Sequence, residues 1–256
     1  MATVETTFAT PTRRRFIAFH KWDRNFYAVF LAACWLGVLM GFIPAALKRH
    51  AGQADYPAPL ILAIHAVAFS AWMALLTTQI LLIRTVRPKL HKQLGLIGFG
   101  LVPLMAVSAF LSEVYSQRWH FVHPPNSQAF FIIAIFDILS FVVLASLALA
   151  FRRNPAAHKR LILLATTMIV GAAYGRWWGT DLYNLFGEGL SGLLIYTYTG
   201  TNLLLLGSVA YDWWSRGRIH TVYQVAVPVI LAGEIATTII YHSPKWLPIA
   251  RLAIPS

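Results

Sequence analysis

The sequence predicts an all-α polytopic membrane protein with seven transmembrane helices. Of its 256 residues, 58% are hydrophobic and only 12% are charged, so a water-soluble globule of this composition would lack the polar residues to cover its surface. Apolar runs long enough to cross about 30 Å of hydrocarbon recur along the chain. The predicted spans are residues 25–47, 58–83, 93–113, 128–151, 161–176, 189–211 and 221–241.

These spans leave only short loops, so we expect one domain. Residues 1–24 form a basic N-terminal arm, residues 25–241 the transmembrane domain, and residues 242–256 a short tail. The first apolar stretch, NFYAVFLAACWLGVLMGFIPAAL, is too long for the core of a signal peptide and lacks a clear small-residue cleavage site. We therefore expect it to be retained as the first span.

Lysine and arginine are distributed unevenly between alternate loops. If the N-terminus is cytoplasmic, that side holds five in the arm, four in each of the loops near 84–92 and 152–160, and two at 216–218, whereas the other side holds six of the 21. The positive-inside rule then predicts a bacterial inner-membrane protein with its N-terminus in and its C-terminus out. The net charge of +12 indicates contact with anionic lipids of the inner leaflet, with no need for a nucleic acid partner.

One short phrase occurs twice. RPKLHKQL (87–94) and NPAAHKRL (154–161) share Pro-x-x-His-Lys-x-Leu, and SRGRIHTV (215–222) is a degraded third copy without the proline. Proline stops an incoming helix or sets the turn, so each copy marks the start of an odd-numbered span. The pattern predicts one lead helix followed by three helical hairpins.

The histidines of these phrases allow three interpretations. They are interfacial anchors, or they bind an anionic lipid headgroup at helix N-termini, or two of them ligate a haem or a metal. The residues that would serve a headgroup site are basic or imidazole side chains of the three phrases: His91, Lys92, His158, Lys159, Arg160 and His220.

Ionisable residues within the spans gather in the outer half of the predicted bundle. Such residues are costly in a membrane and are usually functional. A spacing of seven also aligns His65, Trp72 and Gln79 on one face of the second span. We expect a polar pocket there, with Asp137 and Arg176 in one connected network; a structural ion pair, a ligand-binding or catalytic pocket, and a proton path remain open. Its candidate residues are His65, Trp72, Gln79, Glu113, Asp137, Arg176, Glu234 and His242.

Cofactor chemistry is only partly constrained. The last span contains no lysine, so no retinal Schiff base is expected, and the single Cys34 leaves no intramolecular disulfide. No nucleotide-binding loop, Gly-x-Ser-x-Gly or Cys-x-x-Cys motif is present. His120 and His123 are weak candidates for a metal site, and we otherwise expect none. A haem, a quinone or a carotenoid remains open.

The stretches HAVAFSAWMALLTTQILL, LHKQLGLIGF and NPAAHKRLILLATTMIVGAAYGR resemble an uncharacterised family of predicted bacterial membrane proteins. The resemblance covers the second to seventh spans and implies the fold and membrane location, but no activity. Lys92 and Gln93 depart from the arginines usual in the family, and Glu234 is not a known feature of it. The residues that match are His65, His91, Lys92, Leu94, Gly95, His158, Arg160, Arg176, Asp212 and His220.

Three functions fit these patterns. The first is a non-enzymatic subunit or binding protein that holds a hydrophobic ligand, cofactor or partner, such as another membrane subunit, through the outer pocket, since nine Trp and sixteen Phe provide aromatic surface. The second is a haem-binding membrane oxidoreductase with His65 as an axial ligand. The third is a small proton-coupled transporter. Whether a reaction is catalysed remains open.

Overall fold

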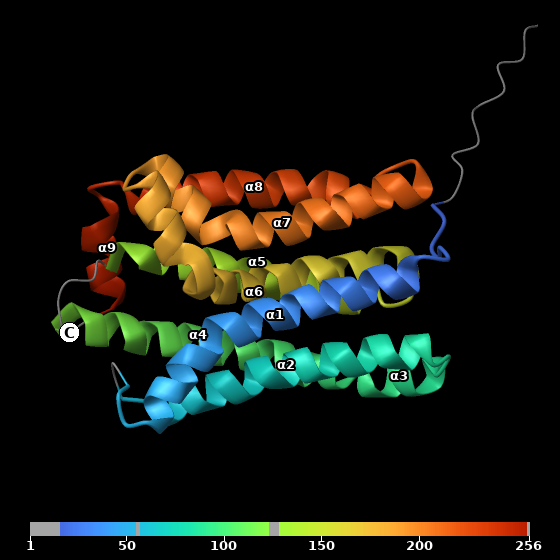
Figure 1. The fold of residues 1–256 in the computed structure, drawn as a ribbon, viewed down its shortest axis with the longest axis horizontal. Helices are drawn as coiled ribbons and strands as arrows, with labels where there is room; N and C mark the ends of the chain where they lie inside the picture. The colour runs from blue at the N-terminus through green and yellow to red at the C-terminus, as the bar shows by residue number, and fades with distance from the viewer. Residues whose placement is uncertain (1–15, 55–56, 123–127, 255–256) are drawn as a thin grey trace, which may run out of the picture.

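The computed structural model describes residues 16–54, 57–122 and 128–254. Over these residues the chain is helical and contains no strand (Figure 1). The elements are α1 (Asp23–His50), α2 (Leu60–Arg84), α3 (Pro88–Leu94), α4 (Ile97–Val122), the 3-10 helix η1 (Gln128–Phe130), α5 (Phe131–Ala150), α6 (Pro155–Phe186), α7 (Leu190–Arg216), α8 (Thr221–Tyr241) and α9 (Trp246–Ala253).

Seven spans are long and apolar enough to cross a membrane among the described residues, with α3 and α4 together forming the third. The predicted fold class is therefore confirmed. The fifth span differs most from its prediction, because α6 covers 32 residues where only 161–176 were expected. Its two ends carry charged and small polar residues, so hydropathy marks only the apolar middle of the helix.

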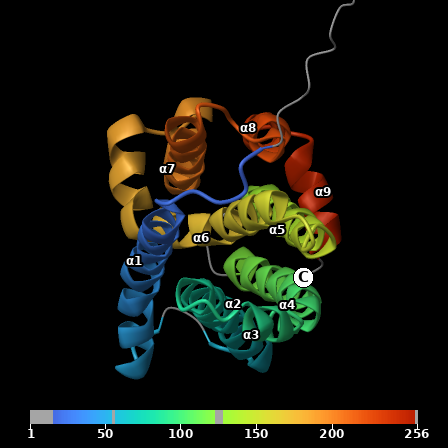
Figure 2. The ribbon, with the colours of Figure 1, turned by 90° about the vertical axis from the view of Figure 1, so that its right-hand side faces the viewer.

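The spans pair as the repeated phrase predicted. α2 packs against α4, α5 against α6, and α7 against α8, while α1 lies along α6 (Figures 1 and 2). The three turns that join these pairs, residues 85–87, 151–154 and 217–220, lie with the start of α1 at one end of the bundle. We call this the basic end and the three turns the joints; the other end is the opposite end.

Local chemistry explains how the joints begin their helices. Pro88 and Pro155 each occupy the first turn of a helix, where a missing amide hydrogen costs nothing. The side chain of Asn154 caps α6 by accepting a hydrogen bond from the amide of Ala157 at 3.3 Å. His220 takes the same role for α8, since its Nδ1 accepts from the amide of Val222 at 3.1 Å.

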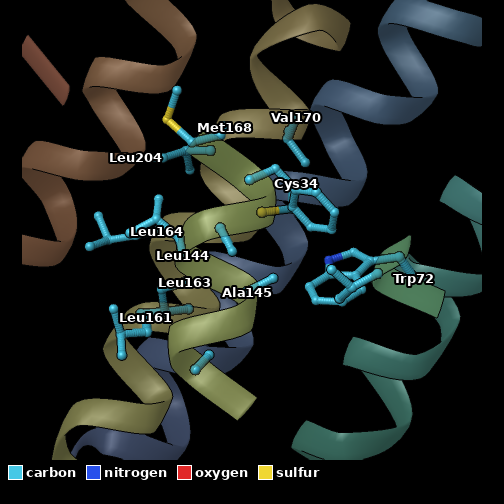
Figure 3. Close-up of a cluster of buried hydrophobic side chains, with 14 of the residues drawn as sticks. Cys34, Trp72, Leu144, Ala145, Leu161, Leu163, Leu164, Met168, Val170 and Leu204 are labelled. Carbon is cyan, nitrogen blue, oxygen red and sulfur yellow. The ribbon is translucent and has the colours of Figure 1, made fainter. Parts of the chain in front are cut away.

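The core is built around α6, which contacts α1, α5 and α7. Small residues let the backbones approach closely, as in many membrane bundles. On α1, a side chain at Gly37 would collide with the ring of Tyr174, and one at Gly41 with the backbone of Ala173. Around this contact Cys34, Trp72, Leu144, Ala145, Met168 and Leu204 belong to one buried cluster (Figure 3).

The tail contains more structure than the sequence predicted. Residues 246–253 form the short helix α9, and the indole nitrogen of Trp246 donates a hydrogen bond to the carbonyl of Ala129 at 2.9 Å. Ala250 on this helix is fully buried. An eight-residue helix falls well below the length of a span, so hydropathy gave no signal for it.

Candidate functional site

In the half of the bundle near the opposite end, two acidic side chains from different helices act on a third, Asp137. The carboxylates of Glu113 on α4 and Glu234 on α8 both repel that of Asp137 on α5. We call these three residues the acidic cluster. Within the described residues Asp137 makes no hydrogen bond or ion pair. The sequence singled out all three residues, and the structure brings them together.

Polar groups of α7 and α8 complete this site. Glu234 is only 1% exposed, and one of its oxygens accepts a hydrogen bond from the side-chain amide of Asn202 at 2.9 Å. The other oxygen, Oε1, is buried without a partner, as is Oδ1 of Asn202. The hydroxyl of Tyr198 is hydrogen-bonded to that of Thr237 at 2.9 Å. The carboxyl groups of Asp137 and Glu234 both interact electrostatically with it. Sequence reasoning missed the neutral partners Asn202 and Tyr198, because neither is ionised in this setting.

Arg176 corrects one expectation. It forms no ion pair with Asp137: its guanidinium donates to the carbonyl of Ala172 at 2.9 Å and lies 5.0 Å from the ring centre of Phe42. Its charge acts instead on His65 and Glu113. The interpretation of these two residues as a structural ion pair is therefore excluded, because Arg176 lies on an exposed part of α6 and its side chain turns towards α1.

His65, Trp72 and Gln79 lie on one face of α2, and the middle residue, Trp72, faces protein rather than lipid. Trp72 is 4% exposed, donates to the hydroxyl of Thr166 at 3.2 Å and packs edge-on against Phe141. His65 contacts the ring of Phe69, with centroids 4.1 Å apart, and its buried Nδ1 has no hydrogen-bond partner. Both side-chain amide atoms of Gln79 are also buried without partners.

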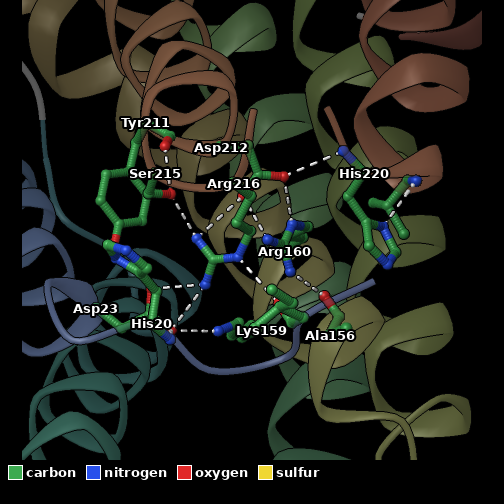
Figure 4. Close-up of polar contacts among 12 residues, drawn as sticks. His20, Asp23, Ala156, Lys159, Arg160, Tyr211, Asp212, Ser215, Arg216 and His220 are labelled. Carbon is green, nitrogen blue, oxygen red and sulfur yellow. Dashed lines mark hydrogen bonds and ion pairs between the residues drawn. The ribbon is translucent and has the colours of Figure 1, made fainter. Parts of the chain in front are cut away.

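At the basic end, the structure reveals a network of ion pairs that the sequence did not predict (Figure 4). Arg160, only 1% exposed, donates from Nε to the carboxylate of Asp212 at 2.7 Å and makes a second bond to it from its terminal nitrogen. Arg216 donates to both oxygens of Asp23, at 2.7 and 2.9 Å, and lies 3.6 Å from Asp212. Lys159 also contacts Asp23, at 2.7 Å.

The residues before α1 close over this network. The ring of Phe16 lies 4.6 Å from the guanidinium of Arg160, 5.7 Å from that of Arg216 and 4.6 Å from the His220 ring. Tyr211 donates to Asp23 at 2.6 Å. We call Asp23, Lys159, Arg160, Asp212 and Arg216 the ion-pair network.

This network engages two of the residues predicted to bind a lipid headgroup. Lys159 and Arg160 each contact an internal carboxylate, and burial leaves Arg160 no open side for a lipid phosphate. Lys92 is exposed at the basic end. His220 is partly buried, and burial together with the nearby Arg160 charge lowers its pKa to about 4, which keeps it neutral at pH 7. In the sequence, the one indication of the ion-pair network is the spacing of Asp212 and Arg216, which lie four residues apart on one helix face.

Among the described residues the remaining candidates form no metal site, although the charge of His120 acts on Glu113 of the acidic cluster. His120 on α4 bonds to the backbone carbonyl of Ser116 at 2.8 Å, and His123 lies outside the described residues. His242 bonds to the carbonyl of Thr238 at 2.9 Å. Within the described part of the chain no group of three or more histidine, cysteine or acidic side chains is placed to hold a metal ion.

Comparison with known proteins adds no relative. No family model matches the chain, and neither a curated protein nor a solved structure matches it. The geometry of its two clusters is therefore the basis for any statement about function.

Proposed function

We propose that this integral membrane protein is a binding protein whose acidic cluster holds a hydrophobic ligand with a cationic group. The observation that carries the proposal is the carboxylate of Asp137, which lies near the charges of Glu113 and Glu234 but has no basic partner in the described chain. Unpaired carboxylates inside a membrane are expensive, so a bound cation or a proton must offset them.

The groups around the cluster suit a ligand that is largely apolar. Phe136 packs against Tyr198, with ring centroids 6.4 Å apart, and Oε1 of Glu234 still has an unused acceptor. An open groove of about 200 Å³ runs along the surface of α7 beside Asn202, the partner of Glu234, and is lined mainly by leucine and isoleucine of that helix. Apolar walls with a few convergent polar groups are typical of small-molecule sites.

A hydrophobic cation of known structure tests the proposal. Tetraphenylphosphonium should bind the purified protein saturably, and Asp137→Asn or Glu234→Gln should weaken binding at least about tenfold, since one charge contact in a partly dry site exceeds about 1.4 kcal/mol. Asp181→Asn removes an exposed acid from α6 and serves as the control. Equal affinity in the wild type and both cluster variants would exclude a cation site here.

The same carboxylates support proton-coupled transport as a second candidate. A carboxyl group that releases its proton when the ligand binds couples the movement of protons to the movement of the ligand. In proteoliposomes a pH gradient should then drive tetraphenylphosphonium accumulation that Asp137→Asn abolishes. Binding without accumulation would favour the simple binding protein. The alternative of a haem at His65 is tested separately by the absorption spectrum of the purified protein. A Soret band that is lost in His65→Ala would support it.

The proposal places the basic end in the cytoplasm of a bacterium, against the anionic leaflet of its inner membrane. Exposed aromatic side chains at that end support a membrane–water interface there: Trp213 is 67% exposed, Trp214 65% and Trp22 44%. Their rings would lie at the level of the lipid headgroups, beside the lysines and arginines of the joints. Other membrane subunits remain candidate partners for the apolar outer surface.

A further inference from the structure

Two histidines of the repeated phrase meet at the basic end, although 67 residues separate them in the chain. His91 lies in α3 and His158 in α6, and their ring centroids are 6.4 Å apart, with the ring planes at 86°. Each is the fourth residue of its helix, following Pro88 or Pro155 at the first position. The repeat thus brings two equivalent imidazoles together, and the ion-pair network uses neither.

The hydrogen bond of His158 fixes which of its nitrogens is available. Its Nδ1 lies 2.8 Å from the backbone carbonyl of Ala148 on the preceding helix. A carbonyl oxygen only accepts, so Nδ1 carries the hydrogen and Nε2 keeps a free lone pair. A histidine that donates Nδ1–H to a backbone carbonyl is the usual form of a metal ligand.

His91 has the corresponding surroundings on α2. Its ring contacts the backbone carbonyl of Gln79, as the ring of His158 contacts that of Ala148. The two side-chain amide atoms of Gln79 are buried and unpaired. Buried polar atoms without partners are rare in native proteins, so the unpaired amide of Gln79, the residue whose backbone carbonyl His91 contacts, indicates a site for an additional bound species.

The distance between the rings fits one metal ion. Each imidazole nitrogen binds a metal at about 2.0–2.1 Å, so two rings on opposite sides of one ion have centres roughly 6 Å apart. Neutral imidazole is a preferred ligand of copper, zinc and iron. No third His, Cys or acidic ligand joins the two histidines among the described residues.

We propose that His91 and His158 are the two protein ligands of a transition-metal centre at the joint between α3 and α6. That centre is either a bare ion in linear coordination or the iron of a porphyrin. The exposed Lys92, whose charge acts on His91, suits a centre with anionic groups, such as porphyrin carboxylates. This site is remote from the acidic cluster, so either assignment can fail without the other.

Metal analysis of the purified protein tests the site directly. Copper(I), zinc(II) and haemin are each added alone, and bound metal per chain is measured by mass spectrometry and absorption. We expect one equivalent of one probe in the wild type. His91→Ala and His158→Ala should each reduce its affinity at least tenfold, and the double variant should lose little more, because a two-ligand centre fails when either ligand is missing. A Soret band identifies the porphyrin, and copper binding without one identifies the bare ion.

Two controls separate ligation from folding. His242→Ala removes a histidine at the opposite end, and His220→Asn changes the third joint while keeping an acceptor for the amide of Val222. Both should bind like the wild type. His158→Met replaces one ligand by another, so metal should remain bound with an altered spectrum. If the wild type and the double His variant bind all three probes equally, the two imidazoles are not metal ligands.

Discussion

Arg160 and Asp212 form an ion pair with two hydrogen bonds between α6 and α7, 52 residues apart in the chain. The side chains are only 1% and 3% exposed. Since neither charge reaches bulk water, the stability of each depends on the presence of the other.

Removing one partner should therefore destabilise the bundle strongly. Arg160→Met alone and Asp212→Leu alone should each cost about 3–5 kcal/mol, since the remaining charge is left buried and unpaired. The double variant should cost much less than their sum. Unfolding in detergent measures the free-energy change of the two single variants and of the double variant. Arg153→Met, at an exposed position, is the control and should change the free energy of unfolding by almost nothing. Simple additivity would show that the two charges do not stabilise each other.

The contact between α1 and α6 depends on glycine. A side chain at Gly41 would collide with the backbone oxygen of Ala173, which cannot move as the end of a flexible side chain could. Gly41→Leu should lower the free energy of unfolding by about 1–3 kcal/mol or more. Gly100→Ala, at a helical glycine with open space around it, should be neutral or slightly stabilising. Equal effects at both positions would contradict close packing of α1 on α6.

The pH dependence of stability should contain a contribution from His220. Its pKa in the folded protein is about 4, below its ordinary value of 6.5. As the pH falls the unfolded chain takes up a proton first, so stability from the neutral ring is complete above pH 6.5 and is lost as the pH falls toward 4. Protonation also removes the Nδ1 acceptor that caps α8.

His220→Asn retains an acceptor but cannot titrate in this range. Thermal unfolding midpoints between pH 7 and pH 4 should therefore fall less steeply in this variant than in the wild type. Parallel curves would mean that His220 does not titrate differently in the folded and unfolded chain.

The ends of the bundle should differ in access from the cytoplasm. Single cysteines at Arg153 and at Glu188, in a Cys34→Ser background, lie at the basic and the opposite end. A membrane-impermeant maleimide added to intact cells should label Glu188→Cys and spare Arg153→Cys until the cells are opened. The reverse pattern would invert the predicted orientation.

Sequence reasoning recovered the spans because apolar length is a local property. It also placed Pro88, Pro155 and His220 at the starts of helices, which the structure confirms. It missed the partner of Arg160, because a buried ion pair depends on which helices become neighbours and Asp212 is far away in the chain. The absence of an Asp137–Arg176 ion pair has the same origin, since hydropathy gives the depth of a residue in the membrane but not the direction in which its side chain points.

The contacts of Asp23 imply an order of events during synthesis. Asp23 begins the first helix, while its partners Lys159 and Arg216 follow 136 and 193 residues later. At about 5–20 residues per second, a ribosome needs roughly 10–40 s to reach Arg216 after Asp23. Until Lys159 has been inserted, Asp23 has neither of these partners and is solvated at the membrane surface. The N-terminal segment therefore closes over the bundle only when nearly the whole chain has been inserted, so a chain stopped before Arg216 would keep this end open.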